Sequence, residues 1–181
     1  NKQTGFKKNL INKTIELGKK ILRKEKLKLS EKIINFLCHN LVRRKIQKQF
    51  GGDLQAFVSG GGALDKDVGE FLNAVGLPTL QGYGLTETSP VVSCNLPGSI
   101  KVETVGPPFK TNQVKIAEDG EILVKGENVM LGYWNKEKET NEILKNGWLH
   151  TGDIGEIDSN GYLKITDRKK DIIVNHGGDN I

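Results

Sequence analysis

The sequence is poor in the residues that crosslink a chain, bind metals or cross a membrane. Among 181 residues there are two cysteines and three histidines, and aromatic residues make up 6%. Cys38 and Cys94 are too few for a disulfide framework and lack the spacing of metal ligands, so we expect a reducing, cytoplasmic compartment. No apolar run approaches the roughly 18 residues of a membrane helix. The composition, 36% apolar and 27% charged, excludes collagen-like and low-complexity chains and indicates a globular protein with a buried core.

The two ends of the sequence carry neither a signal peptide nor a tail. The first residue is Asn1 rather than Met, and the chain stops at Gly177-Gly-Asp-Asn-Ile181. We therefore expect a piece of a longer reading frame.

The net charge of +5 is distributed unevenly. Residues 1–50 hold 15 Lys and Arg against three Glu, a net +12, whereas residues 51–181 hold 12 Lys and Arg against 19 Asp and Glu, a net −7. Apolar residues recur at helical spacing from Lys7 to about Lys26, and again from a predicted N-cap at Ser30 to a stop at Gly51-Gly52. The second helix should bury a face made of Ile34, Leu37, Cys38, Leu41 and Val42.

This basic segment, residues 1–50, allows three interpretations. Its lysines can be solvated on two surface helices, or they can make a peripheral contact with anionic lipid at the inner face of a membrane. Nucleic-acid binding comes third, because no aromatic residues are interleaved with the basic ones, and we expect no nucleic-acid partner. The sequence does not indicate an oligomeric state.

The hydrophobic period changes after residue 50. A strand at 55–58, a helix at 65–75 and a strand at 79–81 predict a βαβ unit, with the helix burying Val68, Phe71, Leu72 and Val75. Two hairpins should follow, one pairing 113–117 with 121–125 and one pairing 154–157 with 162–166 across Asp158-Ser-Asn-Gly161. The predicted fold class is mixed α/β: a βαβ part of a parallel sheet with covering helices, then a small antiparallel sheet or distorted barrel.

The segment Gly82-Tyr-Gly-Leu-Thr-Glu-Thr88 follows a predicted strand and holds groups suited to a nucleotide. Gly82 and Gly84 let the backbone turn sharply and let a ligand approach closely. Tyr83 offers a flat face for a base, while Thr86 and Glu87 offer a hydroxyl and a carboxylate for a phosphate and its Mg²⁺. The carboxyl edge of a parallel sheet is also where ligands bind in α/β folds.

Three further motifs each have a structural and a functional interpretation. The Ser59-Gly-Gly-Gly62 loop can be a plain turn or can admit a planar ring, and it is not a P-loop because no Lys-Ser/Thr follows. Asp153 can form an Asx-turn, or can accept the two hydroxyls of a ribose from the start of a strand. The charged turn Asp167-Arg-Lys-Lys-Asp171 can be a solvated loop or a hinge. Isolated histidines give no metal cluster or triad, and Cys38 is more typical of a core position.

Taken together in this order, four motifs resemble the AMP-forming acyl-adenylate synthetases, a family that includes acyl-CoA synthetases, nonribosomal-peptide adenylation domains and firefly luciferase. The resemblance runs from about Phe50 to Ile181, and the Lys-rich helical insertion before it is similar to that of long-chain fatty acyl-CoA synthetases. The motifs are Phe57-Val-Ser-Gly-Gly-Gly-Ala-Leu64, Gln81-Gly-Tyr-Gly-Leu-Thr-Glu-Thr88, Gly147-Trp-Leu-His-Thr-Gly-Asp153 and Ile165-Thr-Asp-Arg-Lys-Lys-Asp-Ile-Ile173.

The resemblance implies a reaction and roles for matched residues. Such enzymes convert a carboxylate and Mg·ATP into an acyl-adenylate and pyrophosphate, then exchange AMP for coenzyme A. Matched by position, Thr86 would bind phosphate, Glu87 would bind Mg²⁺, and Gly84 would shape the loop around the nucleotide. The remaining roles fall to Tyr83 (adenine stacking), Gly61 and Gly62 (the facing wall), Asp153 (ribose hydroxyls), Arg168 (assistance from the same side) and Lys170 (the hinge of a rotating C-terminal domain).

The resemblance also divides the chain into four parts and limits what it can do. After the basic helical segment, residues 51–104 would be the α/β part of the AMP-binding domain, 105–170 an antiparallel β subdomain, and 171–181 the start of a C-terminal domain. These 181 residues lack the family's Ser/Thr/Gly-rich phosphate loop and its adenylation lysine, so we expect a fragment of a larger N-terminal domain that is inactive alone.

Three functions are weighed against each other. The first is a long-chain fatty acid–CoA ligase using ATP, Mg²⁺ and coenzyme A. The second is another adenylate-forming enzyme, acting on an aryl or amino acid. The third, from a different class, is a non-enzymatic basic module at a membrane, whose glycine loops are structural turns. Departures from the family pattern, Gly62-Ala63 in place of Ala-Pro, His176 in place of a small residue and Asp179 in place of Glu, weaken the subgroup assignment.

Overall fold

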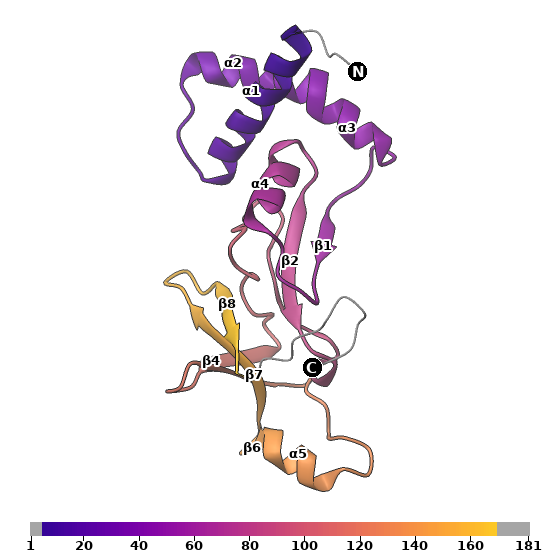
Figure 1. Cartoon of the computed structure of the whole chain (residues 1–181), viewed down its shortest axis with the longest axis vertical. Helices are drawn as coiled ribbons and strands as arrows, with labels where there is room; N and C mark the ends of the chain where they lie inside the picture. Colours follow the sequence, from indigo (N-terminus) through magenta and orange to yellow (C-terminus); the bar gives the residue numbers. More distant parts are fainter. Residues whose placement is uncertain (1–4, 170–181) are drawn as a thin grey trace. The chain divides into compact units, whose positions relative to one another are not determined.

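The computed structural model describes residues 5–169 and divides them into two compact units, drawn with their elements in Figure 1. The first unit comprises residues 5–82 and 95–103, and the second comprises residues 83–94 and 104–169. The first contains α1 (Gly5–Leu22), α2 (Leu29–Cys38), the π-helical turn η1 (His39–Arg43), α3 (Arg44–Gln49), β1 (Phe57–Ser59), α4 (Lys66–Ala74) and most of β2 (Thr79–Gly84). The second contains the short 3₁₀ turn η2 (Thr86–Thr88), β3 (Val91–Cys94), β4 (Asn112–Ile116), β5 (Glu121–Gly126), α5 (Glu137–Ile143), β6 (Leu144–Lys145), β7 (Trp148–Ile157) and β8 (Leu163–Arg168).

The predicted βαβ unit is confirmed in the first unit. β1 and β2 pair in parallel, with Phe57 opposite Thr79 and Ser59 opposite Gln81, and α4 connects them. The carboxylate of Asp65 accepts the backbone N–H of Val68 at 3.0 Å and so caps the start of α4.

The face of α4 that is buried differs from the prediction. Val68 and Phe71 were expected to point inward but are 47% and 43% exposed. Val75 is buried as predicted, but the buried residues within the helix are Gly69, Glu70 and Ala74. Glu70 pairs with Lys19 of α1 and Ala74 packs against Gly18, whereas Gly69 faces Leu64 and Val102. A Cβ added at Gly18 of α1 would collide with the backbone of Ala74, so small residues set the helix–helix contact.

The helices of residues 5–49 are tied together by a buried arginine. Figure 1 shows α2 and α3 as one long run of helix, interrupted only by η1, with α1 crossing it. Arg43 of η1 is 7% exposed and donates to the carbonyl of Ala74 (2.8 Å), the carbonyl of Thr14 (3.0 Å) and the side chain of Asn35 (2.8 Å). One side chain therefore joins α1, α2 and the end of α4, and its burial lowers the pKa of its guanidinium.

The start of α2 and its apolar face correct two predictions. Ser30 is not the N-cap: the helix begins at Leu29, because the Glu31 carboxylate accepts the backbone N–H of Lys28 at 2.9 Å and the amino group of Lys20 at 2.6 Å. Cys38 and Val42 are buried as predicted, whereas Leu37 and Leu41 of the same predicted face are 48% and 46% exposed.

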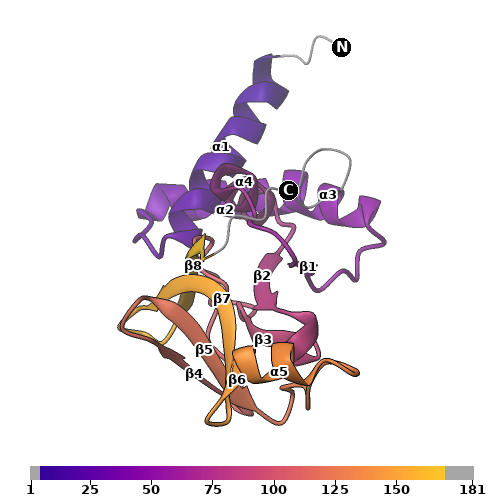
Figure 2. The same cartoon turned by 60° about the horizontal axis from the view of Figure 1, so that its bottom comes forward.

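The second unit is a five-stranded antiparallel sheet in the order β4-β5-β7-β6, with β8 paired to β7 (Figure 2). Both predicted hairpins are confirmed, although β7 is longer than expected because its first half pairs with β5 and its second half with β8. Asp158 closes the second turn by accepting the backbone N–H groups of Asn160 and Tyr162. The core of this unit is one apolar cluster made of Val92, Val105, Ile122, Val124, Leu149 and Leu163.

The mixed α/β class predicted from the sequence is therefore confirmed. Within residues 5–169, every helix is too short or too polar to cross a bilayer. Residues 171–181 and the predicted hinge Lys170 lie outside the described residues.

Candidate active site

Tyr83 lies at the end of β2 and contacts a residue far away in the sequence. Its hydroxyl donates a hydrogen bond of 2.6 Å to Oδ2 of Asp153. Burial, together with this bond to a carboxylate, raises the pKa of the Tyr83 phenol well above its usual value. Tyr83 therefore stays neutral at physiological pH and directs its proton toward a carboxylate.

Asp153 is 4% exposed and lies inside β7, not at the start of a strand as predicted. Its Oδ1 accepts the Nε–H of Arg168 at 2.9 Å, and the two residues stand opposite each other in the β7–β8 pairing. Because its side chain bonds to Tyr83 and Arg168, the Asx-turn alternative does not describe it. A buried carboxylate is costly unless it is paired, and here both oxygens have protein donors.

Thr86 and Glu87 lie side by side in η2, directly after β2. Thr86 is exposed, and Glu87 is half-buried with its Oε1 accepting the hydroxyl of Tyr133 at 2.6 Å. That hydrogen bond, with burial, raises the pKa of Tyr133 to about 12. The Glu87 carbonyl accepts the N–H of Met130 at 2.8 Å, so the loop at 128–133 fixes both the backbone and the carboxylate of Glu87.

The three glycines predicted to bind the nucleotide, Gly61, Gly62 and Gly84, differ in how much space surrounds them. A Cβ at Gly84 would collide with the carbonyl oxygen of Pro90, so chain packing alone requires glycine there. Gly61 and Gly62 lie in the first unit, and a Cβ at either would meet nothing within 4 Å. Gly61 also has a φ of +78°, which favours glycine whatever its function.

The structure thus forms two groups of predicted residues within the second unit. Tyr83, Asp153 and Arg168 form one hydrogen-bonded trio, called here the Asp153 group. Thr86 and Glu87 form the other, on a turn held by Tyr133. The half-buried Glu87 carboxylate and the exposed Thr86 hydroxyl beside it fit Mg²⁺. Proteins commonly hold this ion through one or two carboxylates, while phosphates and water complete its coordination shell.

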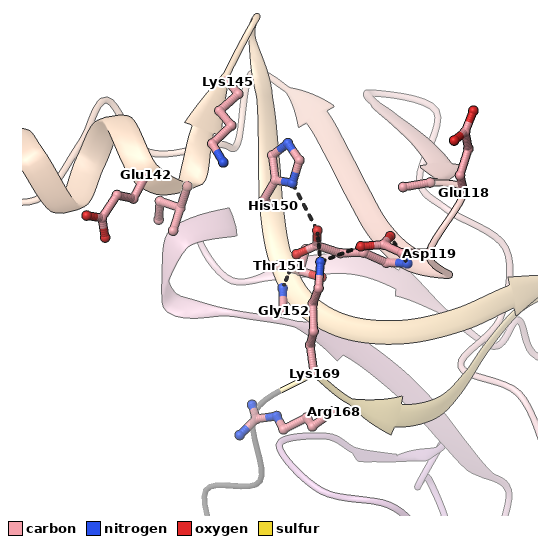
Figure 3. Close-up of a pocket in the computed structure, with 12 residues that line it drawn as sticks. Glu118, Asp119, Glu142, Lys145, His150, Thr151, Gly152, Arg168 and Lys169 are labelled. Atoms are coloured by element: carbon pink, nitrogen blue, oxygen red, sulfur yellow. Dashed lines mark hydrogen bonds and ion pairs between the residues drawn. The ribbon is translucent and has the colours of Figure 1, made fainter.

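A cavity of about 890 Å³ opens beside the Asp153 group (Figure 3). Its lining includes Gly152 and Arg168, which adjoin or belong to that group, but not Tyr83, Glu87 or Asp153. Figure 3 shows Arg168 directed away from the cluster of Lys169, Asp119 and His150. The sequence predicts that Glu87 and Asp153 contribute to one nucleotide site, and neither residue lines this cavity.

Two residues of the site were missed from the sequence. Tyr133 is not among the predicted site residues, and its contact with Glu87 spans 46 positions. Glu121 was placed only as the start of a strand, yet it is 5% exposed and bonds to His150, Gly152 and Lys169. A glutamate at an inward strand position was the available signal, because buried carboxylates need partners.

The charged run at 167–171 also differs from the prediction. Asp167 and Arg168 belong to β8 rather than to a turn. Arg168 pairs with Asp153, and the amino group of Lys169 lies 2.5 Å from Asp119 and 3.1 Å from Glu121. Arg168 and Lys169 are therefore held in ion pairs rather than lying in a solvated loop.

Comparison with protein families and with curated sequences finds relatives of this chain. The family model described as AMP-binding enzyme matches residues 19–134. This chain is 46% identical over 141 residues to the long-chain-fatty-acid–CoA ligase FadD15 of Mycobacterium bovis, an alignment that covers 78% of this chain and 24% of that protein. The chain thus spans about a quarter of the length of this relative.

Comparison with solved structures agrees. The N-terminal domain of FACL13 from Mycobacterium tuberculosis has a TM-score of 0.56 and 31% identity, over 62% of this chain and 31% of that one. O-succinylbenzoate coenzyme A synthetase from Bacillus subtilis, solved with ATP and a magnesium ion, has a TM-score of 0.59 and 31% identity, over 76% of this chain and 33% of that one.

Proposed function

This chain belongs to the family of AMP-binding enzymes, and on that premise we propose that the intact protein is an AMP-forming acid–thiol ligase, specifically a long-chain fatty acid–CoA ligase. It would activate a fatty acid with Mg·ATP to an acyl-adenylate and then transfer the acyl group to coenzyme A. The similarity to FadD15 supports the fatty acid as substrate. The Asp153 group is the single observation that carries the nucleotide chemistry.

In the first half-reaction the carboxylate attacks the α-phosphate and pyrophosphate leaves. Catalysis of this kind depends on position and electrostatics more than on covalent chemistry by the protein. Asp153 would hold the ribose hydroxyls, and Arg168 would orient that carboxylate through its Nε–H. Tyr83 would stack its ring on adenine while its hydroxyl contacts Asp153.

The phosphate end of the nucleotide would lie at η2. Thr86 would donate its hydroxyl to a phosphate oxygen, and Glu87 would hold Mg²⁺, which when bound neutralises phosphate charge. Tyr133 would keep the Glu87 carboxylate oriented through its hydroxyl. Lys170 would serve as the hinge between the two half-reactions, a conformational step of the lid kind.

Binding of a ribose has a specific consequence at Asp153. Each carboxylate oxygen already accepts one hydrogen bond, from Tyr83 or from Arg168. An ionised carboxylate has about four acceptor positions, so ribose hydroxyls can share these oxygens without displacing Arg168. The hydroxyl of Tyr83 is the donor expected to shift when its ring contacts a base.

The test is nucleotide binding by the chain of residues 1–181. AMP and Mg·ATP are titrated by calorimetry into the wild type, the Asp153→Ala variant and the matched control Glu156→Ala, which removes a 62% exposed carboxylate from the same strand. We expect Asp153→Ala to weaken binding about tenfold or more and Glu156→Ala to leave it unchanged. Unchanged binding in Asp153→Ala would contradict the assignment.

A second candidate substrate is supported by the similarity to O-succinylbenzoate coenzyme A synthetase. The intact protein would then activate an aryl acid by the same chemistry. ATP–pyrophosphate exchange by the intact protein, with fatty acids of increasing length and with aryl acids, separates the two. Exchange that depends on a long-chain fatty acid supports the ligase proposed above, and exchange with aryl acids alone would replace it.

Exposed apolar residues on α2 favour one further property, a peripheral contact with anionic lipid. Leu29, Ile33 and Phe36 lie on one side of the helix and are 77%, 60% and 67% exposed, within the basic segment. Such a stripe beside lysines suits an interfacial helix. Flotation of the intact protein with anionic vesicles should fall sharply in the triple variant Leu29→Ser, Ile33→Ser, Phe36→Ser, and absence of wild-type flotation at low salt would contradict the contact.

A further inference from the structure

Glu121 opens β5 and is one of the few buried carboxylates among the described residues. Its Oε1 accepts the backbone N–H of Gly152 at 2.9 Å. Its Oε2 lies 3.0 Å from Nδ1 of His150 and 3.1 Å from the amino nitrogen of Lys169. Asp119 joins the same cluster by accepting a hydrogen bond from Lys169 at 2.5 Å, and Figure 3 shows Lys169 directed toward it.

The cluster keeps Glu121 ionised. Burial acts to raise the pKa of Glu121, but the hydrogen bonds from His150, Gly152 and Lys169 outweigh it and hold the pKa below its usual value. The same contacts raise the pKa of Lys169, first through Asp119 and then through Glu121. At physiological pH Glu121 and Lys169 are therefore both charged and form an ion pair. The Glu121 carboxylate accepts three of the hydrogen bonds in this cluster.

The partners of Glu121 flank the Asp153 group. Gly152 immediately precedes Asp153 in β7, and Lys169 immediately follows Arg168 at the end of β8. The backbone N–H of Lys169 also donates to the carbonyl of Gly152 at 2.7 Å. Gly152, Lys169 and Glu121 are therefore all bonded to one another. Lys169 bonds to Glu121 while Arg168 bonds to Asp153, so two consecutive basic residues hold two different carboxylates.

The backbone conformation of Gly152 explains why its N–H needs the Glu121 carboxylate as an acceptor. Its φ of +72° interrupts the extended backbone of β7 just before Asp153. A strand that departs from regular pairing at that point needs another acceptor for its N–H, and the Glu121 carboxylate supplies it. The orientation of Asp153 thus depends on a hydrogen bond from a different strand.

A contribution to stability alone does not explain why the charged residues Glu121 and Lys169 lie next to the Asp153 group. Buried ion pairs are often replaceable by apolar residues of similar volume without loss of stability. Glu156 and Lys164 offer a contrast on the same pair of strands: they form an exposed glutamate–lysine pair at 3.2 Å with no link to Asp153 or Arg168.

We propose that Glu121 is a positioning residue for the nucleotide site: through Gly152 and Lys169 it fixes the backbone that carries Asp153 and Arg168. It also holds Lys169, the residue directly before the hinge position Lys170. This inference rests on the proposed function for its effect on AMP, while its effect on the backbone stands independently.

The test uses the chain of residues 1–181 with three variants. Glu121→Gln keeps an acceptor for the Gly152 N–H but loses the charge that binds Lys169, whereas Glu121→Leu removes both contacts. Glu156→Gln is the matched control. AMP affinity is measured by calorimetry, and residue-resolved amide exchange is measured by NMR at Gly152, Lys169 and the core amides of β5.

We expect exchange at Lys169 to rise in both Glu121 variants and exchange at Gly152 to rise only in Glu121→Leu, while the β5 core stays protected. AMP affinity should fall about tenfold in Glu121→Leu and about threefold in Glu121→Gln, and should not change in Glu156→Gln. If Glu121 only stabilised the fold, amide exchange would rise throughout the second unit. Exchange at Gly152 would then not differ between Glu121→Gln and Glu121→Leu.

The outcomes separate this proposal from the proposed function. If the wild type binds AMP and Glu121→Leu binds it equally well, positioning by Glu121 is wrong. If the wild type does not bind AMP, the nucleotide assignment fails, and amide exchange alone decides the matter. In that case localised exposure of Gly152 and Lys169 supports positioning of the backbone, and unchanged exchange overturns it.

Discussion

The two units of this chain are stabilised in different ways. The second unit has a continuous apolar core, in which Val92, Ile122, Val124 and Leu163 are completely buried between strands. The helices of the first unit meet around charged side chains, Arg43 and Glu70, while many of their large apolar residues are exposed. The unit that holds the Asp153 group is therefore built on an apolar core with the charged cluster of Glu121 beside the site, whereas in the first unit charged side chains lie between the helices.

The largest effect is expected from the core of the second unit. Leu163→Ala removes a fully buried side chain and leaves a cavity, which should lower the free energy of unfolding by about 3–4 kcal/mol. Ile157→Ala, on the same hairpin but 38% exposed, should cost less than about 1 kcal/mol. Denaturant unfolding followed by the protection of β5 and β7 amides measures both, and equal losses would show that the apolar core does not dominate this unit.

The first unit should be most sensitive at Arg43. Arg43→Met keeps much of the side-chain volume but leaves the carbonyls of Thr14 and Ala74 without this donor, at a cost of about 2–3 kcal/mol. Arg44→Met, an exposed neighbour, should change stability by less than about 0.5 kcal/mol. Helical circular dichroism during denaturation, with amide exchange of β5 as a reference, should show the loss confined to the first unit. A matching loss of protection in β5 would mean that the two units do not differ as described.

Glu70 should make the first unit sensitive to acid. Burial acts to raise its pKa, but hydrogen bonds from Arg23 and Lys19 hold it below its usual value of 4.5. Since the folded-state pKa is lowered, this stabilisation is present above pH 4.5 and is lost as the pH falls through the folded-state value. Glu70→Gln should cost about 1–2 kcal/mol at neutral pH and flatten the decline below pH 4.5. An unchanged acid profile in this variant would be evidence against the ion pair.

The smallest effect is expected at Tyr133. Tyr133→Phe removes only the hydroxyl that orients Glu87, and the ring is 38% exposed. Affinity for Mg·ATP should fall by no more than about threefold, with AMP affinity unchanged because AMP does not require the metal. Calorimetric titration of both nucleotides measures the difference, and a loss of AMP affinity would place Tyr133 near the base or ribose instead.

Local sequence signals were sufficient for the βαβ unit and for the two hairpins, whereas β3, α5 and β6 were not predicted. The Asx-turn at Asp158 and the turn before Glu121 mark the hairpins. The loop predicted from Gly82 begins later than expected, because β2 extends to Gly84. These features depend on residues a few positions apart, which sequence reasoning can read.

Features that depend on distant partners were not predicted. Glu31 moved the start of α2 because its carboxylate reached both Lys28 and Lys20. Ala74, rather than Val68 and Phe71, became the contact of α4 with α1, because Gly18 of α1 lets the two helices approach closely there. Neither partner is encoded in the hydrophobic period of the helix itself.

The same limit applies to the site. The residue types at Tyr83, Asp153 and Arg168 were singled out from the sequence, and the structure joins them directly. Glu121 and Tyr133 act through contacts that span 29 to 48 positions, and no local pattern indicates them.

The most direct measurement is a crystal structure of the chain grown with AMP. We expect the ribose hydroxyls within about 3 Å of the Asp153 carboxylate, the base against the ring of Tyr83, and Arg168 still bound to Oδ1. Ordered AMP in the cavity beside Glu142 and His150, with Asp153 contacting only Tyr83 and Arg168, would contradict the nucleotide site proposed for this chain.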